Sequence, residues 1–280
     1  MCNLLLANLT RLKKNILFIF SAAVMLIFGI FTPISIYSDK IKYLQLQEAD
    51  KVIGGYVIFV CIIMAFICCV FCGEEYDGGT VRNKLSVGHI RMHIYSAQFL
   101  TCIIAGVILC LLYLIPALLL GSILLDAFET NFGLLLLYFI SGILCVCACI
   151  SIYCMLMTMI PKRTAGTAFT TFIMLVLIFI ANQVRILLII PAETYQFPVI
   201  NGVVTEIYGK NPHYPTGIYR KFLEIFFDVL PSGQAYQIFF RNPQHFQTAE
   251  HLPRMIAFSC MIIALSFLTG VRIFEKKDIK

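Results

Sequence analysis

Residues 53–72 are IGGYVIFVCIIMAFICCVFC, and residues 73–96, which follow directly, are GEEYDGGTVRNKLSVGHIRMHIYS. The first run has no charged residue and has the length of about 20 residues that an α-helix needs to cross the hydrocarbon core of a bilayer. The second run is polar and is interrupted by glycines, which break helices. Together they predict a membrane-spanning helix that ends in a polar loop.

The chain as a whole is also strongly apolar. Of its 280 residues 60% are hydrophobic and 13% are charged, whereas a soluble domain has about 25% charged residues. This composition excludes a soluble enzyme, a nucleic-acid-binding protein and a secreted disulfide scaffold. We predict an all-α polytopic membrane protein, a single transmembrane domain over residues 1–280. Its six spans are expected at about residues 15–36, 53–72, 97–125, 134–160, 165–190 and 255–273.

The basic residues predict the orientation of these spans, because loops rich in Lys and Arg face the cytoplasm. Six spans place both termini on one side. With the termini inside, the inner segments hold 12 of the 21 basic and 5 of the 15 acidic residues, a net charge of +7. The outer segments then carry a net charge of −1. We expect both termini in the cytoplasm.

Two segments outside the spans have the pattern of amphipathic helices. In residues 2–14, Leu5, Leu9 and Leu12 share one helical face, which predicts an interfacial helix on the inner membrane surface. A simple extension of the first span is the alternative. In the outer segment, residues 191–254, we expect a surface or partly re-entrant helix at 218–230, because 13 residues are too few to cross a bilayer.

Twelve cysteines are present, and all except Cys2 lie in apolar runs. We interpret them as reduced, small apolar residues. Cys145, Cys147 and Cys149 alternate along a helix, so we expect them to point in different directions and to form no metal site.

We find no residues that predict catalysis or nucleotide binding by this chain. A phosphate-binding loop needs the pattern GxxxxGK[ST], which does not occur. No acidic residue lies deep enough in a span to act as a proton or sodium relay. We therefore expect no catalytic, cofactor-binding or metal-binding residues.

The loop at 73–96 resembles the pattern G-x-E-[FY]-x-x-G-T-[IV]-[RK]-N-K-L, which lies between spans two and three of bacterial type-2 ABC exporter permeases. The residues that match it are Glu75, Tyr76, Gly79, Thr80, Arg82, Asn83 and Lys84. Leu230-Pro231-Ser232-Gly233-Gln234 and the ending Phe274-Glu275-Lys276-Lys277-Asp278 are also similar to segments of that family.

The resemblance implies a multi-pass subunit of the bacterial cell membrane that works as a pair, a homodimer or a heterodimer, with two cytoplasmic ATPase subunits. ATP and magnesium would be bound by those subunits. The loop would supply a coupling helix that docks on the ATPase. The expected coupling residues are Glu74, Glu75, Tyr76, Gly79, Thr80, Arg82, Asn83, Lys84 and Arg91.

Spans two and five would line the translocation path. Its expected lining is apolar with a few hydroxyls and one amide: Tyr56, Met64, Phe66, Thr167, Thr170, Thr171 and Asn182. Such a lining suits a hydrophobic or amphipathic cargo. Within the family this favours peptides of the bacteriocin or phenol-soluble-modulin type over drugs or lipids.

Two other hypotheses stay open at this stage. The chain could be a sensor or immunity protein that binds a peptide through residues 191–254 without pumping it. It could also be a membrane enzyme that uses Glu74 and Glu75, or the pair Cys69 and Cys72.

Overall fold

The structure is a computed structural model of the chain. It describes residues 1–43, 49–128, 130–160, 162–196, 199–200, 203–204, 207–240 and 248–277. Pro161, Asp278 and parts of the outer segment therefore lie outside the described residues. Six described helices are long and apolar enough to cross a membrane, the number that we predicted. They are α2 (Ile16–Tyr43), α3 (Tyr56–Asp77), α5 (Arg91–Leu124), α6 (Phe132–Met159), α7 (Arg163–Leu188) and α10 (Thr248–Lys276).

The bounds of four of these helices differ from the predicted spans by five residues or more. Helix α2 continues to Tyr43 and α3 to Asp77, beyond the expected ends at residues 36 and 72. Helices α5 and α10 begin at Arg91 and Thr248, several residues before the expected starts at 97 and 255. Hydropathy locates only the part of a helix that lies inside the hydrocarbon core. Backbone hydrogen bonding continues into the polar interface, so the helices extend beyond their apolar segments.

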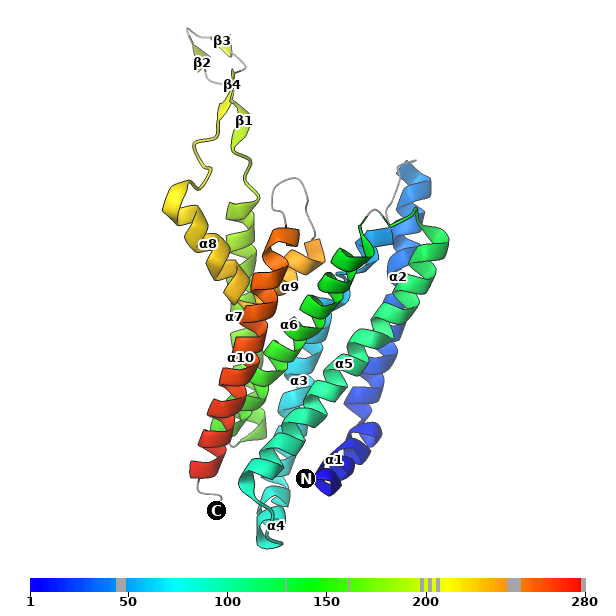
Figure 1. The fold of residues 1–280 in the computed structure, drawn as a ribbon, viewed down its shortest axis with the longest axis vertical. Helices are drawn as coiled ribbons and strands as arrows, with labels where there is room; N and C mark the ends of the chain where they lie inside the picture. The colour runs from blue at the N-terminus through cyan, green and yellow to red at the C-terminus, as the bar shows by residue number, and fades with distance from the viewer. Residues whose placement is uncertain are drawn as a thin grey trace.

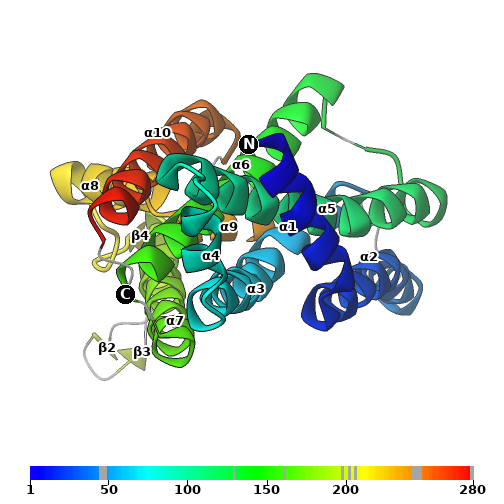
Figure 2. The same cartoon turned by 90° about the horizontal axis from the view of Figure 1, so that it is seen from below.

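Helices α3 and α6 form the centre of the bundle and are its most buried spans. Helices α2 and α5 pack together on one side, while α7 and α10 lie on the other (Figure 1). Seen along the bundle, α3 and α7 are neighbours and form one outer face (Figure 2). Both termini lie at the same end, which we call the terminal end (Figure 1).

Two short helices lie at the terminal end. Helix α1 (Cys2–Lys14) is separate from α2, because Asn15 between them is extended and its Oδ1 accepts a hydrogen bond from Leu17 N at 2.9 Å. Its buried stripe is Leu4, Asn8 and Leu12, so a polar residue lies among the leucines. Helix α4 (Thr80–Ser86) follows α3. The short 3-10 helix η1 (Ala49–Val52) precedes α3 at the opposite end.

The opposite end, which we call the loop end, carries the outer segment. It contains an antiparallel hairpin that was not predicted: β1 (Glu193–Gln196) pairs with β4 (Ile207–Lys210), and β2 (Val199–Ile200) with β3 (Val203–Val204). The hairpin projects away from the bundle (Figure 1). Helices α8 (Gly217–Val229) and α9 (Pro231–Phe240) follow it.

Helix α8 turns its apolar face away from the bundle. Ile218, Phe222 and Ile225 are exposed, whereas Leu223 and Phe227 are buried. Helix α9 packs against α7, α6 and α3. The guanidinium of Arg185 on α7 stacks on the ring of Phe240 on α9, 3.7 Å from the ring centroid.

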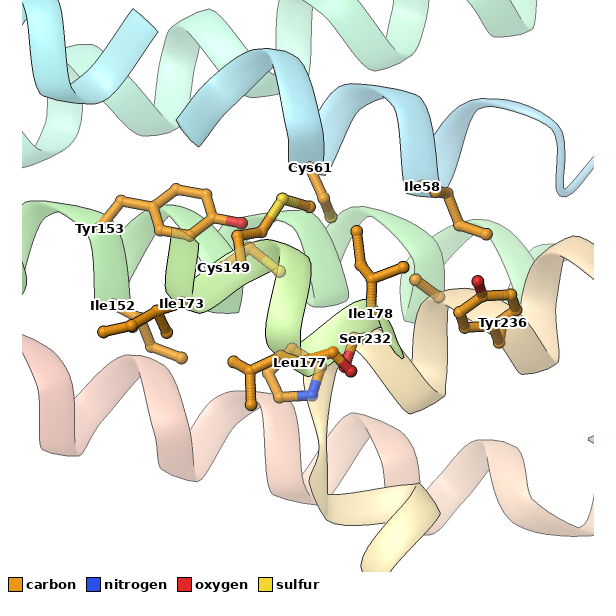
Figure 3. Close-up of a pocket in the computed structure, with 13 residues that line it drawn as sticks. Ile58, Cys61, Cys149, Ile152, Tyr153, Ile173, Leu177, Ile178, Ser232 and Tyr236 are labelled. Atoms are coloured by element: carbon orange, nitrogen blue, oxygen red, sulfur yellow. The ribbon is translucent and has the colours of Figure 1, made fainter. Parts of the chain in front are cut away.

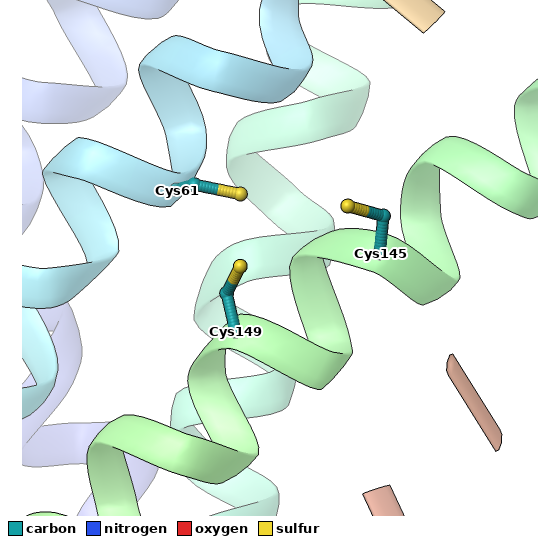
Figure 4. Close-up of side chains that lie close together, drawn as sticks. All are labelled: Cys61, Cys145 and Cys149. Atoms are coloured by element: carbon teal, nitrogen blue, oxygen red, sulfur yellow. The ribbon is translucent and has the colours of Figure 1, made fainter. Parts of the chain in front are cut away.

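The cysteine geometry differs from our expectation. Cys145 and Cys149 lie four residues apart on α6, on the same face of the helix, and both point towards Cys61 of α3 (Figure 4). Alternation separates residues that are two positions apart on a helix, but residues at i and i+4 lie above one another. The expectation that this set cannot bring thiols together was wrong.

Candidate coupling site and translocation groove

The centre of the terminal end is Glu75, whose side chain is fully buried near the end of α3. Its Oε1 lies 2.6 Å from Arg11 Nη1 of α1 and 2.8 Å from Lys84 Nζ of α4. A buried carboxylate is costly unless cations and hydrogen bonds compensate it. Glu75 therefore links α3 to α1 and to α4. Its partners Arg11 and Lys84 lie 64 and 9 residues away in the chain.

Arg11 makes further contacts with α3. It donates a hydrogen bond to the Phe71 carbonyl oxygen, and its guanidinium lies over the Phe71 ring at 3.8 Å from the centroid. Lys84 also reaches α1, because its Nζ lies 3.3 Å from Asn8 Oδ1. The buried Asn8 therefore contacts Lys84 of α4, although its neighbours on the buried stripe are leucines. Helix α1 is fixed to α3 and α4 by polar contacts as well as by its leucines.

The start of α4 is capped by a glycine and not by the neighbouring Thr80. Gly79 occupies the capping position, with a φ of 65°, in the left-handed region that glycine enters without strain. Thr80 is the first helical residue and donates from Oγ1 to the Glu75 carbonyl oxygen at 3.1 Å. The hydroxyl therefore closes the end of α3 instead of the start of α4.

The outer face of α4 and its continuation is exposed. Arg82 and Asn83 are exposed on α4, and the apolar side chains of Val87 and Ile90 beyond it are 79% and 61% exposed. Contact with water is unfavourable for apolar side chains. Exposed apolar side chains outside the membrane therefore often mark a surface that binds a protein partner. The expected coupling residues therefore fall into two sets, with Glu75, Tyr76 and Lys84 turned inwards and Arg82 and Asn83 turned outwards.

The remaining expected coupling residues connect neighbouring helices. Glu74 Oε1 lies 3.3 Å from Arg163 Nη2 at the start of α7. Arg91 at the start of α5 donates to the carbonyl oxygens of Phe274 and Glu275, at 3.2 and 3.1 Å, near the end of α10. A cation there complements the negative end of the helix dipole.

Tyr76 packs its ring against Phe274, with centroids 6.3 Å apart. Lys277 lies over the same tyrosine ring at 4.7 Å and donates to the Thr158 carbonyl oxygen at 2.5 Å. Burial lowers the pKa of Lys277 from its ordinary value. These contacts join the ends of α3, α6 and α10, so the terminal end forms one connected layer.

Four residues that connect this layer were not identified as site residues in the sequence: Asn8, Arg11, Arg163 and Lys277. Arg11 and Arg163 counted only towards membrane topology, and Lys277 counted towards topology and the family-like ending. A signal was available for both residues of α1, because Asn8 lies four residues from Leu4 and from Leu12, and Arg11 lies seven residues, about two helical turns, after Leu4. The pairing of Arg11 with Glu75 of α3 had no signal in the local pattern, because the two residues are distant in the chain.

An open groove of about 560 Å³ runs between α3 and α7. Three expected path residues, Phe66, Thr167 and Thr171, line it together with Arg163 and Phe172. Four others do not. Tyr56, Met64 and Thr170 are buried inside the subunit, and Asn182 is half-buried further along α7.

Tyr56 illustrates why span residues are hard to assign. Its ring lies 5.8 Å from that of Tyr113 on α5, and its hydroxyl would lie 2.2 Å from a Cβ at Gly142 on α6. The missing side chain at Gly142 makes room for the tyrosine inside the helix bundle. Tyr56 therefore belongs to the packing between α3, α5 and α6.

A second, smaller cavity of about 30 Å³ lies between α3, α6, α7 and α9 (Figure 3). Its lining is apolar and includes Ile58, Ile173 and Leu177, with the hydroxyl of Ser232 and the thiols of Cys61 and Cys149. It is too small for an organic cargo but larger than the space that one water molecule needs.

The loop end contains its own buried charge. Asp228 of α8 is fully buried and lies 2.8 Å from His251 Nδ1 and 3.5 Å from Arg254 Nε, both on α10. Gln237 Nε2 of α9 donates to Asp228 Oδ1 at 3.0 Å. Asp228 therefore joins α8, α9 and α10, and it was not identified in the sequence.

Comparison with known proteins gives one family match. A family model described as "ABC-2 family transporter protein" matches residues 4–209, nearly three quarters of the chain. None of the curated proteins matches it. The match covers α1, the α3–α4 layer and the α3–α7 groove. Such permeases work with an ATPase subunit. The chain therefore belongs to the ABC-2 family and is a multi-pass membrane component of an ABC transporter.

Proposed function

We propose that this chain is the permease of an ATP-driven exporter in the bacterial cell membrane. Two copies form the path across the membrane, and each docks on one cytoplasmic ATPase subunit. The terminal end faces the cytoplasm, in agreement with its net positive charge. ATP and magnesium are bound by the partner.

The observation that carries this proposal is the two-sided character of α4. Its inner side is held by the Lys84–Glu75 ion pair at 2.8 Å, and its outer side exposes Arg82, Asn83 and Val87. A partner that binds the outer side of α4 can displace the membrane helices, because the inner side of α4 is anchored to α3 and moves with it. The mixed charged and apolar surface suits a protein partner.

The transmission route follows from the contacts of Glu75. A shift of α4 moves Glu75, and with it α1 through Arg11 and α3 directly. Glu74 extends the connection to α7 through Arg163. Because α3 and α7 are the two walls of the open groove, displacement at α4 changes the groove.

The groove supports a peptide cargo as our preferred assignment. Phe66, Val70, Phe172 and Leu175 provide apolar contacts, while Thr167 and Thr171 provide hydroxyls. An amphipathic peptide matches both kinds of surface, and a small charged solute matches neither. Export of a drug or lipid is the alternative.

The first experiment isolates the permease with its ATPase from native membranes and measures ATP hydrolysis. Arg82→Glu and Val87→Asp alter only exposed positions of the docking surface, so we expect the ATPase to be lost while the permease stays inserted. Arg272→Glu is the matched control, since Arg272 is an exposed arginine on α10 at the same end. Retention of the ATPase by both docking variants would disprove the proposed interface.

The cargo assignment is tested separately in proteoliposomes that contain the permease and its ATPase. We expect ATP-dependent movement of an amphipathic helical peptide, reduced at least tenfold by Thr171→Trp, which fills the groove. Movement of a lipid or a hydrophobic dye but no peptide would replace the peptide assignment. Peptide binding without any ATP-dependent movement would favour a sensor.

A further inference from the structure

Seven of the twelve cysteines meet inside the bundle, where α3, α5 and α6 pack together. We define the first thiol cluster as Cys61, Cys145 and Cys149, and the second as Cys68, Cys102 and Cys154. Cys72, one helical turn after Cys68, interacts with Cys102 and Cys154. In each cluster the sulfur atoms all lie within 4.8 Å of one another and every residue is buried.

The spacing of the sulfurs is close to that of a metal–thiolate site. Three sulfurs that each lie about 2.3 Å from a central ion are separated by about 4.0 Å. Sulfur atoms that lie within 4.8 Å of one another can reach this separation by small side-chain rotations, without moving a helix. In the first cluster the three side chains already point their sulfur atoms towards one another (Figure 4).

The first cluster also borders free space. Cys61 and Cys149 line the cavity of about 30 Å³, and the thioether-bearing Met174 of α7 lines it too (Figure 3). The cluster is therefore not fully enclosed by packed carbon atoms. An ion can shift towards the cavity while it remains coordinated by sulfur.

Charge balance selects the kind of ion. Thiolates and thioethers prefer soft ions such as Cu(I) and Zn(II). A net charge inside a membrane-embedded core is costly, and so is each thiol that must lose its proton there. A neutral complex with three sulfurs needs one thiolate for Cu(I) but two thiolates for Zn(II), so Cu(I) requires fewer deprotonated thiols.

We propose that each thiol cluster binds one Cu(I) ion. Binding forms one Cu–thiolate bond and releases one thiol proton to solvent, and no electron is transferred. In the first cluster Cys145 retains its proton and its hydrogen bond to the Pro231 carbonyl oxygen at 3.2 Å, so Cys61 or Cys149 supplies the thiolate. The ions cross-link α3 with α6, and in the second cluster with α5. This proposal does not depend on the identity of the cargo.

The test uses the full chain, purified in detergent under anaerobic conditions and loaded with Cu(I) in the presence of a Cu(I) chelator as competitor. Copper per chain is measured after gel filtration. We expect two ions in the parent protein, one in Cys149→Ser, one in Cys154→Ser and none in the double variant. Cys110→Ser and Cys147→Ser are matched controls, because these buried cysteines belong to neither cluster, and both should keep two ions.

X-ray absorption at the copper edge provides a second readout, in which we expect a shell of sulfur neighbours alone. Each variant must elute as a single species, and Cys→Ala replaces Cys→Ser where it does not. A chain without copper, a nitrogen or oxygen shell, or equal copper loss in the controls overturns the proposal. A single ion controlled by one cluster overturns it for the other.

Discussion

The two ends of the bundle each bury one carboxylate completely, but they recruit its partners from different distances. At the terminal end, Glu75 pairs with Arg11 and Lys84, which lie on separate helices before and after it. At the loop end, Asp228 pairs with His251 and Arg254, both on the helix that follows the α8–α9 pair. The first network joins helices from distant parts of the chain. The second joins the consecutive helices α8, α9 and α10, which we call the local unit.

This difference has a mechanical consequence. The Glu75 network connects α4, whose outer face is free for a partner, to a helix that lines the groove. The Asp228 network connects α8 and α9 to α10, and no described residue of it belongs to α3 or α4. We therefore expect the terminal end to decide coupling and the loop end to decide local stability.

The largest effect is expected from Glu75→Ala. It leaves Arg11 and Lys84 without their shared carboxylate, and breaking a buried ion pair costs about 3–5 kcal/mol. We expect thermal unfolding in detergent at a clearly lower temperature, and at least a tenfold loss of transport per ATPase complex. The readouts are a melting curve and transport in proteoliposomes.

Glu74→Ala is the matched control for the melting curve, because the neighbouring Glu74 is about one-third exposed and pairs with the half-buried Arg163 at 3.3 Å. Surface pairs of this kind contribute about 0–1 kcal/mol. Equal decreases in unfolding temperature in Glu74→Ala and Glu75→Ala would show that the buried network contributes no more to stability than a surface pair.

The next effect is expected from Asp228→Asn, which keeps the shape of the side chain and removes its charge. Hydrogen bonds to charged groups contribute about 1.5–3 kcal/mol, so we expect a decrease in unfolding temperature smaller than that of Glu75→Ala. Binding of the ATPase should be unchanged, as judged by co-purification. Loss of the ATPase in this variant would contradict the division of roles between the two ends.

Much of the fold was predictable because the physical signals are local. A run of about 20 apolar residues specifies a span wherever it occurs, and the glycines around Thr80–Ser86 delimit α4. The hairpin at the loop end also had a local signal in the dipeptide Asn201-Gly202 between β-branched residues, which we did not use.

The site was less predictable because its partners are distant in sequence. Arg11 faces Glu75 across 64 residues, and Cys61 faces Cys145 and Cys149 from another helix. In both cases the local pattern permits a simpler explanation, a topology charge or an apolar filler. Tyr56 was assigned to the path for the same reason, since a tyrosine in a span does not reveal whether it faces a groove or Gly142.

A smaller effect is expected from Gly54→Ala at the loop end. A Cβ at Gly54 would lie 2.0 Å from the Ile238 carbonyl oxygen of α9, a backbone atom that cannot rotate away. Overpacking of this kind costs about 1–3 kcal/mol. Gly133→Ala is the control, because nothing lies within 4 Å of its Cβ. Melting curves should separate the two variants, and equal unfolding temperatures would disprove a close contact between α9 and the segment that precedes α3.

The smallest effect is expected from Glu224→Gln on α8. Glu224 Oε1 lies 3.0 Å from Arg220 Nε one helical turn earlier, and Arg220 also lies over the Tyr214 ring at 4.7 Å. An i,i+4 pair contributes about 0.3–0.5 kcal/mol, so the unfolding temperature should barely change. The double variant with Arg220→Gln measures the coupling directly. A coupling energy as large as that of the Glu75 network would mean that charge pairing is equally important at both ends, and the contrast between a coupling end and a local unit would no longer hold.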